Sequence, residues 1–248
     1  MQAVILAAGF GERLRPYTER VPKALLEVGG RPVIDHLLDF LFPTPDIETI
    51  HIRTNGLYYP LFKDWLRGCE YMGKVELSTN GVNTPEGKLG AVGDIEDFCS
   101  RKRIQEDFLV AAGDNIFGFS IQEFLDFCSD TEGDVVVVTE TRSKKALKEG
   151  GVVRLTSNGR IIDFEEKPQK PKSNMLALPF YRLSAESIPF LRKYLMGGND
   201  RDCIGSFFTW SYRRRPLFAY QTDGVRYHLT DPASYKKACS AFEKTKKV

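Results

Sequence analysis

The sequence predicts an α/β fold, in which a Rossmann-like, mostly parallel sheet is flanked by helices. Short apolar runs alternate with stretches whose apolar residues recur at helical spacing, as expected for βαβ units. One run, residues 134–141, contains four consecutive valines, which is typical of a strand buried on both faces. After Thr141 the pattern changes to hairpin-like segments. We therefore expect a smaller antiparallel lobe to follow the parallel core.

The composition is that of an ordinary globular protein. The chain has 248 residues, of which 42% are hydrophobic and 27% are charged, and this length can bury a sizeable core. A net charge of +2 gives no general attraction to nucleic acid or to anionic membranes. The five cysteines stand far apart without a CxxC motif, so reduced thiols are expected rather than zinc or a disulfide framework. No apolar run approaches the length of a membrane span and no signal peptide is evident, which predicts a soluble, cytoplasmic protein.

Residues 1–141 are expected to form the parallel core. Sheets of this kind bind ligands at the carboxyl ends of their strands, so Asp114 and the loop after the first strand are expected to face the same crevice. The predicted strands are residues 3–7, 48–53, 74–79, 107–115 and 134–141, and the predicted helices are residues 32–42, 58–67, 89–103 and 120–128.

Residues 142–248 are expected to form the second lobe and a closing helix. No break in composition marks a linker, so residues 1–248 are predicted to be a single domain. Asn158-Gly159 favours a tight turn between two strands, and Asp231 suits the N-cap of the last helix. The predicted strands are residues 151–156, 160–165, 175–181, 217–222 and 224–229, and the predicted helices are residues 185–195 and 232–244.

The loop after the first strand combines glycines with cations. Gly9 and Gly11 are followed by Arg13 and Lys23. Glycines let backbone N–H groups approach a ligand closely, and such groups bind phosphate well. Arginine and lysine add the positive charge that a polyphosphate needs. The sequence therefore predicts a phosphate-binding loop at this end of the sheet.

Two common nucleotide-binding motifs do not fit. A dinucleotide fingerprint would need a third glycine where the chain has Leu14. A P-loop would need Ser or Thr after Gly87-Lys88, where the chain has Leu89. An NAD enzyme and a Walker-type ATPase are therefore both disfavoured.

The loop resembles the signature of nucleotidyltransferases that activate sugar 1-phosphates, which reads Leu-Ala-(Ala/Gly)-Gly-x-Gly-x-Arg-Leu-x-Pro-x-Thr and then Pro-Lys. The corresponding residues here are Leu6-Ala7-Ala8-Gly9-Phe10-Gly11-Glu12-Arg13-Leu14-Arg15-Pro16-Tyr17-Thr18 and Pro22-Lys23. Later segments resemble the family in the same order: Gly113-Asp114-Asn115-Ile116-Phe117, Gly151-Val152-Val153, and Phe164-Glu165-Glu166-Lys167-Pro168. The resemblance covers nearly the whole chain. The motifs are most similar to those of glucose-1-phosphate thymidylyltransferases and uridylyltransferases.

This resemblance implies a nucleotide-diphospho-sugar transferase fold, in which residues 1–141 bind the nucleotide and residues 142–248 supply the sugar-binding lobe. A sugar 1-phosphate would attack the α-phosphorus of a nucleoside triphosphate (NTP) with Mg²⁺ as cofactor, and pyrophosphate would leave. A phosphate monoester has a second pKa of about 6, so the nucleophile is largely ionised near neutral pH and requires no general base. The implied partners are the two substrates, with no nucleic acid or membrane, and homo-oligomerisation stays open.

The resemblance also implies roles for single residues. The catalytic residues would be Arg13, which neutralises the triphosphate, Lys23, which bridges the two phosphates, and Asp114, which holds Mg²⁺. The nucleotide would lie against Leu6, Ala8, Gly9, Gly11, Asn80 and Gly90, and the sugar phosphate against Gly151, Glu166 and Lys167.

One position departs from the family pattern. The family has an aspartate as second Mg²⁺ ligand in its C-terminal segment, and an alignment through Pro232 and Tyr235 places His228 there. Imidazole suits softer metals than Mg²⁺. Asp114 would then hold the metal with the triphosphate alone, or with help from Asp223 or Asp231, or His228 would be a metal ligand or a bystander.

Two alternatives to the leading hypothesis follow. One is a nucleotide-sugar-binding regulatory homologue with weak catalysis, which the histidine suggests. The other is the same reaction on a non-sugar phosphate such as phosphocholine or an inositol phosphate.

Overall fold

The computed structural model describes residues 1–71 and 73–245, and the chain divides into two compact units. The N-terminal unit comprises residues 2–88, 112–118 and 225–248, and the central unit comprises residues 89–111 and 119–224 together with residue 1. The single-domain organisation with a division near residue 141 stays a prediction. Among the described residues, no helix combines the length and hydropathy that a membrane span requires.

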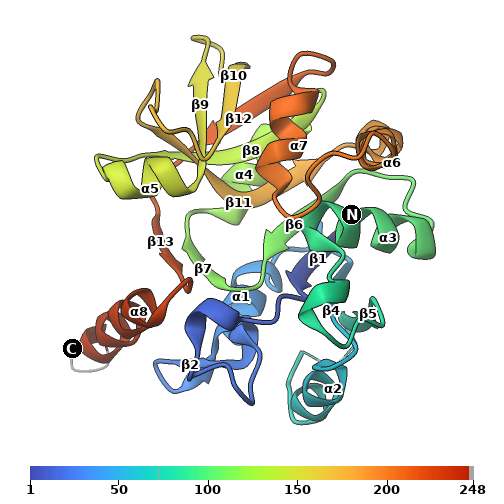
Figure 1. The fold of residues 1–248 in the computed structure, drawn as a ribbon, viewed down its shortest axis with the longest axis vertical. Helices are drawn as coiled ribbons and strands as arrows, with labels where there is room; N and C mark the ends of the chain where they lie inside the picture. Colours follow the sequence, from blue (N-terminus) through green and yellow to red (C-terminus); the bar gives the residue numbers. More distant parts are fainter. Residues whose placement is uncertain (72, 246–248) are drawn as a thin grey trace. The chain divides into compact units, whose positions relative to one another are not determined.

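The N-terminal unit is built on three parallel strands in the order β1–β4–β5 (Figure 1). Helix α1 lies between β1 and β4 in the chain, and α2 lies between β4 and β5. The fully buried residues of α1 recur at spacings of one and three, at Val33, Ile34, Leu37, Leu38 and Leu41. This spacing gives the helix one apolar face. The bounds are β1 Gln2–Ala7, α1 Val33–Leu41, β4 Thr49–Thr54, α2 Tyr59–Arg67 and β5 Val75–Thr79.

Smaller elements complete this unit. The predicted N-cap is confirmed, because the Asp231 carboxylate accepts a hydrogen bond from the Ser234 amide at 2.8 Å. Pro32 lies in a short strand instead of opening α1, so that expectation is wrong by one residue. The elements are η1 Glu12–Leu14, η2 Lys23–Leu25, β2 Glu27–Val28 paired with β3 Arg31–Pro32, η3 Pro85–Gly87, β7 Asn115–Gly118 paired with β13 Val225–His228, and α8 Pro232–Thr245.

The predicted strand at residues 107–115 is interrupted. Strand β6 (Phe108–Ala112) ends before Gly113-Asp114, and β7 begins at Asn115. The Gly113 amide donates to the Leu6 carbonyl at 2.9 Å, and a Cβ on Gly113 would lie 3.0 Å from that oxygen. The glycine thus allows the chain to turn against the end of β1, which places Asp114 in a turn and not in a strand.

An apolar cluster holds the opening segment against the C-terminal part of the chain. Leu14, Val28, Val33 and Leu229 are fully buried in it, and Ala238 of α8 packs among them. Tyr235 packs against the cluster, and its hydroxyl donates to the Glu27 carbonyl at 2.8 Å. The loop after β1 is therefore anchored by packing at Leu14 and just beyond its end at Val28, which limits how far its polar residues can move.

The central unit has a mixed sheet around β11, which pairs antiparallel with β6, β8 and β9, while β12 runs parallel to β8. The predicted hairpin is confirmed as β9 and β10. Parallel strands with helices in one unit and antiparallel strands in the other confirm the predicted α/β class. The bounds are α3 Gly90–Lys102, α4 Ile121–Ser129, β8 Asp134–Glu140, α5 Lys144–Glu149, β9 Gly151–Leu155, β10 Ile161–Glu166, β11 Met175–Leu183, η4 Ala185–Ser187, α6 Ile188–Met196, α7 Ile204–Ser211 and β12 Leu217–Gln221.

Two helices of this unit were not expected from the sequence. Helix α5 has only six residues and begins at a Ser143 cap. Helix α7, orange in Figure 1, contains Gly205, Ser206 and Thr209, which are poor helix formers. Its stability comes from burial of Phe207 and Phe208, which are fully buried, and from packing against β10.

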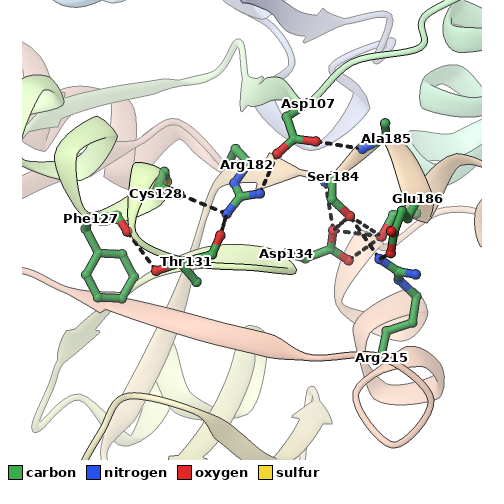
Figure 2. Close-up of polar contacts among 11 residues, drawn as sticks. Asp107, Phe127, Cys128, Thr131, Asp134, Arg182, Ser184, Ala185, Glu186 and Arg215 are labelled. Carbon is green, nitrogen blue, oxygen red and sulfur yellow. Dashed lines mark hydrogen bonds and ion pairs between the residues drawn. The ribbon is translucent and has the colours of Figure 1, made fainter.

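A buried polar network fixes the register of the central sheet (Figure 2). The Asp134 carboxylate accepts hydrogen bonds from the Ser184 amide at 2.9 Å and the Ser187 hydroxyl at 2.7 Å. Arg182, which is 3% exposed, donates to the Asp107 carboxylate at 2.6 Å. Buried charges are tolerated only when they are paired and hydrogen-bonded, so a shift of β11 against β6 or β8 would leave these groups unpaired.

Candidate functional site

Asn55 holds the first turn of the opening loop. Its side chain is fully buried and donates from Nδ2 to the Ala8 carbonyl at 3.0 Å, while its Oδ1 accepts from the Tyr58 amide at 2.8 Å. The Tyr58 hydroxyl donates to the Phe10 carbonyl at 3.3 Å. The end of β4 and the start of α2 therefore fix the loop. Asn55 was not predicted as a site residue, although its position directly after an apolar strand was an available signal.

The glycines of the loop differ in their roles. Gly11 has a φ of 70°, a left-handed conformation that favours glycine, and its carbonyl accepts a hydrogen bond from the Thr18 hydroxyl at 2.7 Å. Gly9 is exposed and a Cβ there would meet no atom within 4 Å. Gly11 thus shapes the turn, whereas Gly9 leaves open backbone beside Ala8 that a ligand can approach.

Lys23 and Asp114 form an ion pair. Lys23 Nζ lies 3.2 Å from Asp114 Oδ2, and the two side chains are 16% and 23% exposed. The structure therefore brings together two residues that are 91 positions apart in the sequence. Asn115 Nδ2 donates to the other carboxylate oxygen of Asp114 at 2.8 Å. Asp114 thus lies in contact with the last residue of the opening loop, while the expectation that both face one crevice stays a prediction.

His228 is the third member of this group. It lies at the end of β13, opposite Asn115 in the ladder with β7, and its Nε2 is 3.6 Å from Asp114 Oδ2. Burial alone would raise the pKa of Asp114, but its interactions with His228 and Lys23 hold that pKa well below its usual range. Asp114 is therefore an ionised carboxylate at neutral pH. We call Lys23, Asp114 and His228 the charge cluster.

The charge cluster supplies only one hard oxygen ligand. Within residues 1–71 and 73–245 there is no group of three or more His, Cys, Asp or Glu that could hold a metal by itself. Mg²⁺ prefers octahedral oxygen coordination and is usually bound by one or two carboxylates together with substrate phosphates and water. The carboxylate of Asp114 fits a shared Mg²⁺ of this kind. Asp231 instead caps α8.

Two other predicted nucleotide-side residues lie in this unit. Arg13 belongs to η1 and is exposed to solvent. The Asn80 side chain accepts from the Val82 amide at 2.9 Å, and its backbone amide donates to the Thr54 carbonyl at 3.0 Å. Asn80 thus forms a local turn at the end of β5, and its contact with a base stays a prediction.

In the central unit, Glu166 and Lys167 follow one another at the end of β10. Lys167 Nζ lies 3.0 Å from Cys203 Sγ and 3.9 Å from Glu166 Oε1. The hydrogen bond to Cys203 raises the pKa of Lys167, and burial raises the pKa of the Cys203 thiol. Burial also raises the pKa of Glu166, which the charge of Lys167 partly offsets. We call Glu166, Lys167 and Cys203 the hairpin site.

The two predicted glycines of the central unit have clear packing roles. A Cβ on Gly151 would lie 2.8 Å from the Phe164 ring, and a Cβ on Gly90 would lie 2.3 Å from the Arg201 carbonyl oxygen. Gly90 also has a φ of 76°. Both positions therefore require glycine for the fold, and their contacts with substrate stay predictions.

A glycine-containing loop after the first strand, with a lysine paired to a carboxylate beside it, defines an α/β protein suited to binding phosphate groups. Residues 2–214 match the family model described as nucleotidyl transferase. The chain belongs to this family.

The relatives in this family act on different substrates. The chain is 30% identical over 183 residues to the UTP–glucose-1-phosphate uridylyltransferase AglF of Haloferax volcanii, covering 73% of this chain and 71% of that protein. It is 28% identical over 78% of its length to the bifunctional protein GlmU of Methanocaldococcus jannaschii, but spans only 42% of that protein. A solved UDP-glucose pyrophosphorylase complexed with UDP-glucose has the same fold, with a TM-score of 0.83, 20% identity and 98% coverage of both chains.

Proposed function

We propose that the protein is a Mg²⁺-dependent nucleotidyltransferase that converts an NTP and a sugar 1-phosphate into an NDP-sugar and pyrophosphate. The observation that carries the proposal is the 3.2 Å pair of Lys23 and Asp114 beside the glycine-containing loop. Family membership supports the transfer of a nucleotidyl group. The relatives named for glucose 1-phosphate support a sugar phosphate as acceptor.

The reaction needs positioning and charge neutralisation more than proton transfer. The sugar phosphate oxygen attacks the α-phosphorus in line, and the bond to pyrophosphate breaks. In this proposal the open backbone at Gly9, beside Ala8, binds the triphosphate, and Arg13 neutralises its charge together with that of the departing pyrophosphate. Lys23 lies against the α-phosphate and the sugar phosphate, where its ammonium stabilises the charge that builds up during transfer.

Asp114 is the residue that would hold the metal. Mg²⁺ bound there with the triphosphate supplies positive charge that stabilises the phosphate oxygens. The pairing with Lys23 keeps the carboxylate ionised before the substrates arrive. Glu166 binds sugar hydroxyls and Lys167 binds the sugar phosphate in the same proposal.

The test is a substrate panel with pyrophosphate detection. Purified protein is incubated with each of five NTPs, with glucose, mannose, galactose and N-acetylglucosamine 1-phosphates, and with phosphocholine and inositol 1-phosphate as non-sugar acceptors. We expect release of pyrophosphate with at least one sugar 1-phosphate, dependent on Mg²⁺. Release with phosphocholine or inositol phosphate alone would reassign the acceptor, and silence across the panel would overturn the proposal.

A second candidate function rests on His228, which lies 3.6 Å from the same carboxylate oxygen as Lys23. An imidazole in place of a second carboxylate offers no hard oxygen ligand to Mg²⁺, so the protein would bind an NDP-sugar with little turnover. Calorimetry with UDP-glucose and dTDP-glucose separates the two functions. Binding without pyrophosphate exchange, together with a gain of activity in His228→Asp, would favour the regulatory function. A panel run in Mn²⁺ shows whether the imidazole favours a softer metal.

A further inference from the structure

The first turn of α7 lies directly against the Glu166 carboxylate. Gly205 is the second residue of this helix, and a Cβ built on it would lie 1.9 Å from Glu166 Oε2 and 2.8 Å from Glu166 Cδ. Gly205 has no left-handed φ, so its backbone conformation does not require glycine. The requirement is space for the carboxylate.

Cys203, the residue before α7, holds the neighbouring lysine. Its sulfur lies 3.0 Å from Lys167 Nζ. The Lys167 backbone has a φ of 49° and its amide donates to the Gly150 carbonyl at 3.0 Å. A left-handed conformation is uncommon for residues with a side chain, and it directs the Lys167 side chain away from the ordinary course of the strand. Lys167 is thus held at both its backbone amide and its ammonium group.

The element that makes these contacts is itself well anchored. The Asp200 carboxylate accepts from the Ser206 hydroxyl at 2.7 Å and from the Asp202 amide at 2.9 Å. The Tyr194 hydroxyl donates to the Asp200 carbonyl at 2.8 Å. Four polar groups around the start of α7 are therefore tied to one another and to α6, so the first turn can serve as a fixed support.

We propose that Gly205 and Cys203 are positioning residues that hold Glu166 and Lys167 in the orientation needed to bind the sugar 1-phosphate. This inference rests on the proposed function and assigns to the first turn of α7 a role in acceptor affinity. Gly205 acts by leaving room for the carboxylate, and Cys203 acts by accepting a hydrogen bond from the ammonium. Neither residue needs to contact the substrate.

Gly205→Ala is the decisive variant. Alanine is a better helix former than glycine, and the atom it would displace is the end of a flexible side chain, so the helix should persist while the carboxylate turns away. We expect the KM for sugar 1-phosphate to rise about tenfold, as for loss of one good hydrogen bond. The KM for NTP and the melting temperature should stay close to wild type. Gly68→Ala is the matched control, because a Cβ there meets only one atom, at an ordinary 3.8 Å.

A double variant separates positioning from general damage. If Gly205 acts through Glu166, then adding Gly205→Ala to Glu166→Ala should raise the KM no further, because interacting residues are not additive. An equal tenfold rise in both backgrounds would show that Gly205 acts elsewhere. For Cys203, Cys203→Ser keeps a hydrogen-bond acceptor and should retain the wild-type KM, whereas Cys203→Val removes the acceptor and should raise it.

Crystal structures of wild type and Gly205→Ala test the placement without turnover. A displaced Glu166 carboxylate supports the inference even if the substrate panel is silent, in which case the proposed function alone fails. Turnover by the wild type with an unchanged KM in Gly205→Ala, or a carboxylate that keeps its position beside the new methyl group, would overturn the inference and leave the proposed function intact.

Discussion

The charge cluster and the hairpin site are built in opposite ways. Lys23, Asp114 and His228 come from three distant segments, and Lys23 Nζ and His228 Nε2 lie 3.2 Å and 3.6 Å from the same Asp114 oxygen. In the hairpin site, Glu166 and Lys167 are adjacent in sequence, and the thiol of Cys203, the residue before α7, is the nearer partner of the ammonium. The charge cluster therefore keeps its carboxylate ionised, whereas the hairpin site works against ionisation of its carboxylate by burying it. This difference suits metal and phosphate binding in one case and hydroxyl recognition in the other.

The largest expected effect concerns the charge cluster. Asp114→Asn removes the carboxylate charge but keeps the size of the side chain. We expect kcat for pyrophosphate release to fall on the order of 100- to 1,000-fold, as for loss of one electrostatic stabiliser of a transition state. Asp64→Asn, an exposed aspartate of α2, is the control. A variant with near wild-type kcat would show that the charge cluster is structural.

Lys167→Ala should have a smaller effect of a different kind. The ammonium is proposed to bind the sugar phosphate in the ground state as well as during transfer. We therefore expect the KM for sugar 1-phosphate to rise roughly 10- to 100-fold, as for a charged hydrogen bond, with a smaller change in kcat. Steady-state kinetics with Lys170→Ala as the exposed control makes the comparison, and a loss confined to kcat would contradict the assigned role.

Asn55→Ala tests whether the loop beside the charge cluster is held from β4. The substitution leaves the Ala8 carbonyl and the Tyr58 amide without their partner. Buried groups that lose a hydrogen bond cost about 1–3 kcal/mol, so the free energy of unfolding in urea should fall by that amount. Asn83→Ala, at an exposed position, should change it by less than about 0.5 kcal/mol.

The smallest expected effect concerns stability as a function of pH. The contributions of Asp114 and Glu166 to the free energy of unfolding should change in opposite directions as pH rises. Asp114 has a lowered pKa, so its contribution to stability is present at neutral pH and is lost as pH falls below about 4, the usual range for aspartate. Glu166 has a raised pKa, so its contribution is present below about pH 4 and is lost as pH rises through its folded pKa.

Thermal unfolding in EDTA checks this contrast. At pH 7, Asp114→Asn should be less stable than wild type and Glu166→Gln more stable, each by about 1 kcal/mol. Both differences should shrink toward pH 4. Equal changes in stability of the same sign in both variants would contradict the contrast between the two sites.

Many of the strands and helices were predictable from the sequence, and those that were not have physical reasons. Periodicity found β1, β4, β5 and the β9–β10 hairpin because their apolar residues alternate or cluster. It missed α7, whose glycine, serine and threonine have low helix propensity and whose stability comes from tertiary packing.

The candidate site residues also divide into those that the sequence predicted and those that it did not. The motif residues Lys23 and Asp114 were predicted and lie in contact. Asn55, Cys203 and Gly205 were not predicted, because their roles depend on partners that only the folded chain brings near. Patterns in sequence therefore identified charged groups, but not the residues that support them.

The loop between α6 and α7 has a consequence for how this enzyme family can be re-engineered. Near the end of this loop, the Arg201 carbonyl accepts from the Val92 amide at 2.9 Å in the first turn of α3, where Gly90 packs against it. Two residues further on, Cys203 contacts Lys167. Exchanging this loop would therefore also disturb the start of α3. If Lys167 and Gly90 contact the acceptor and the nucleotide as proposed, acceptor and nucleotide preferences would not be independent design variables. Changes to one should be selected together with compensating changes at Gly90.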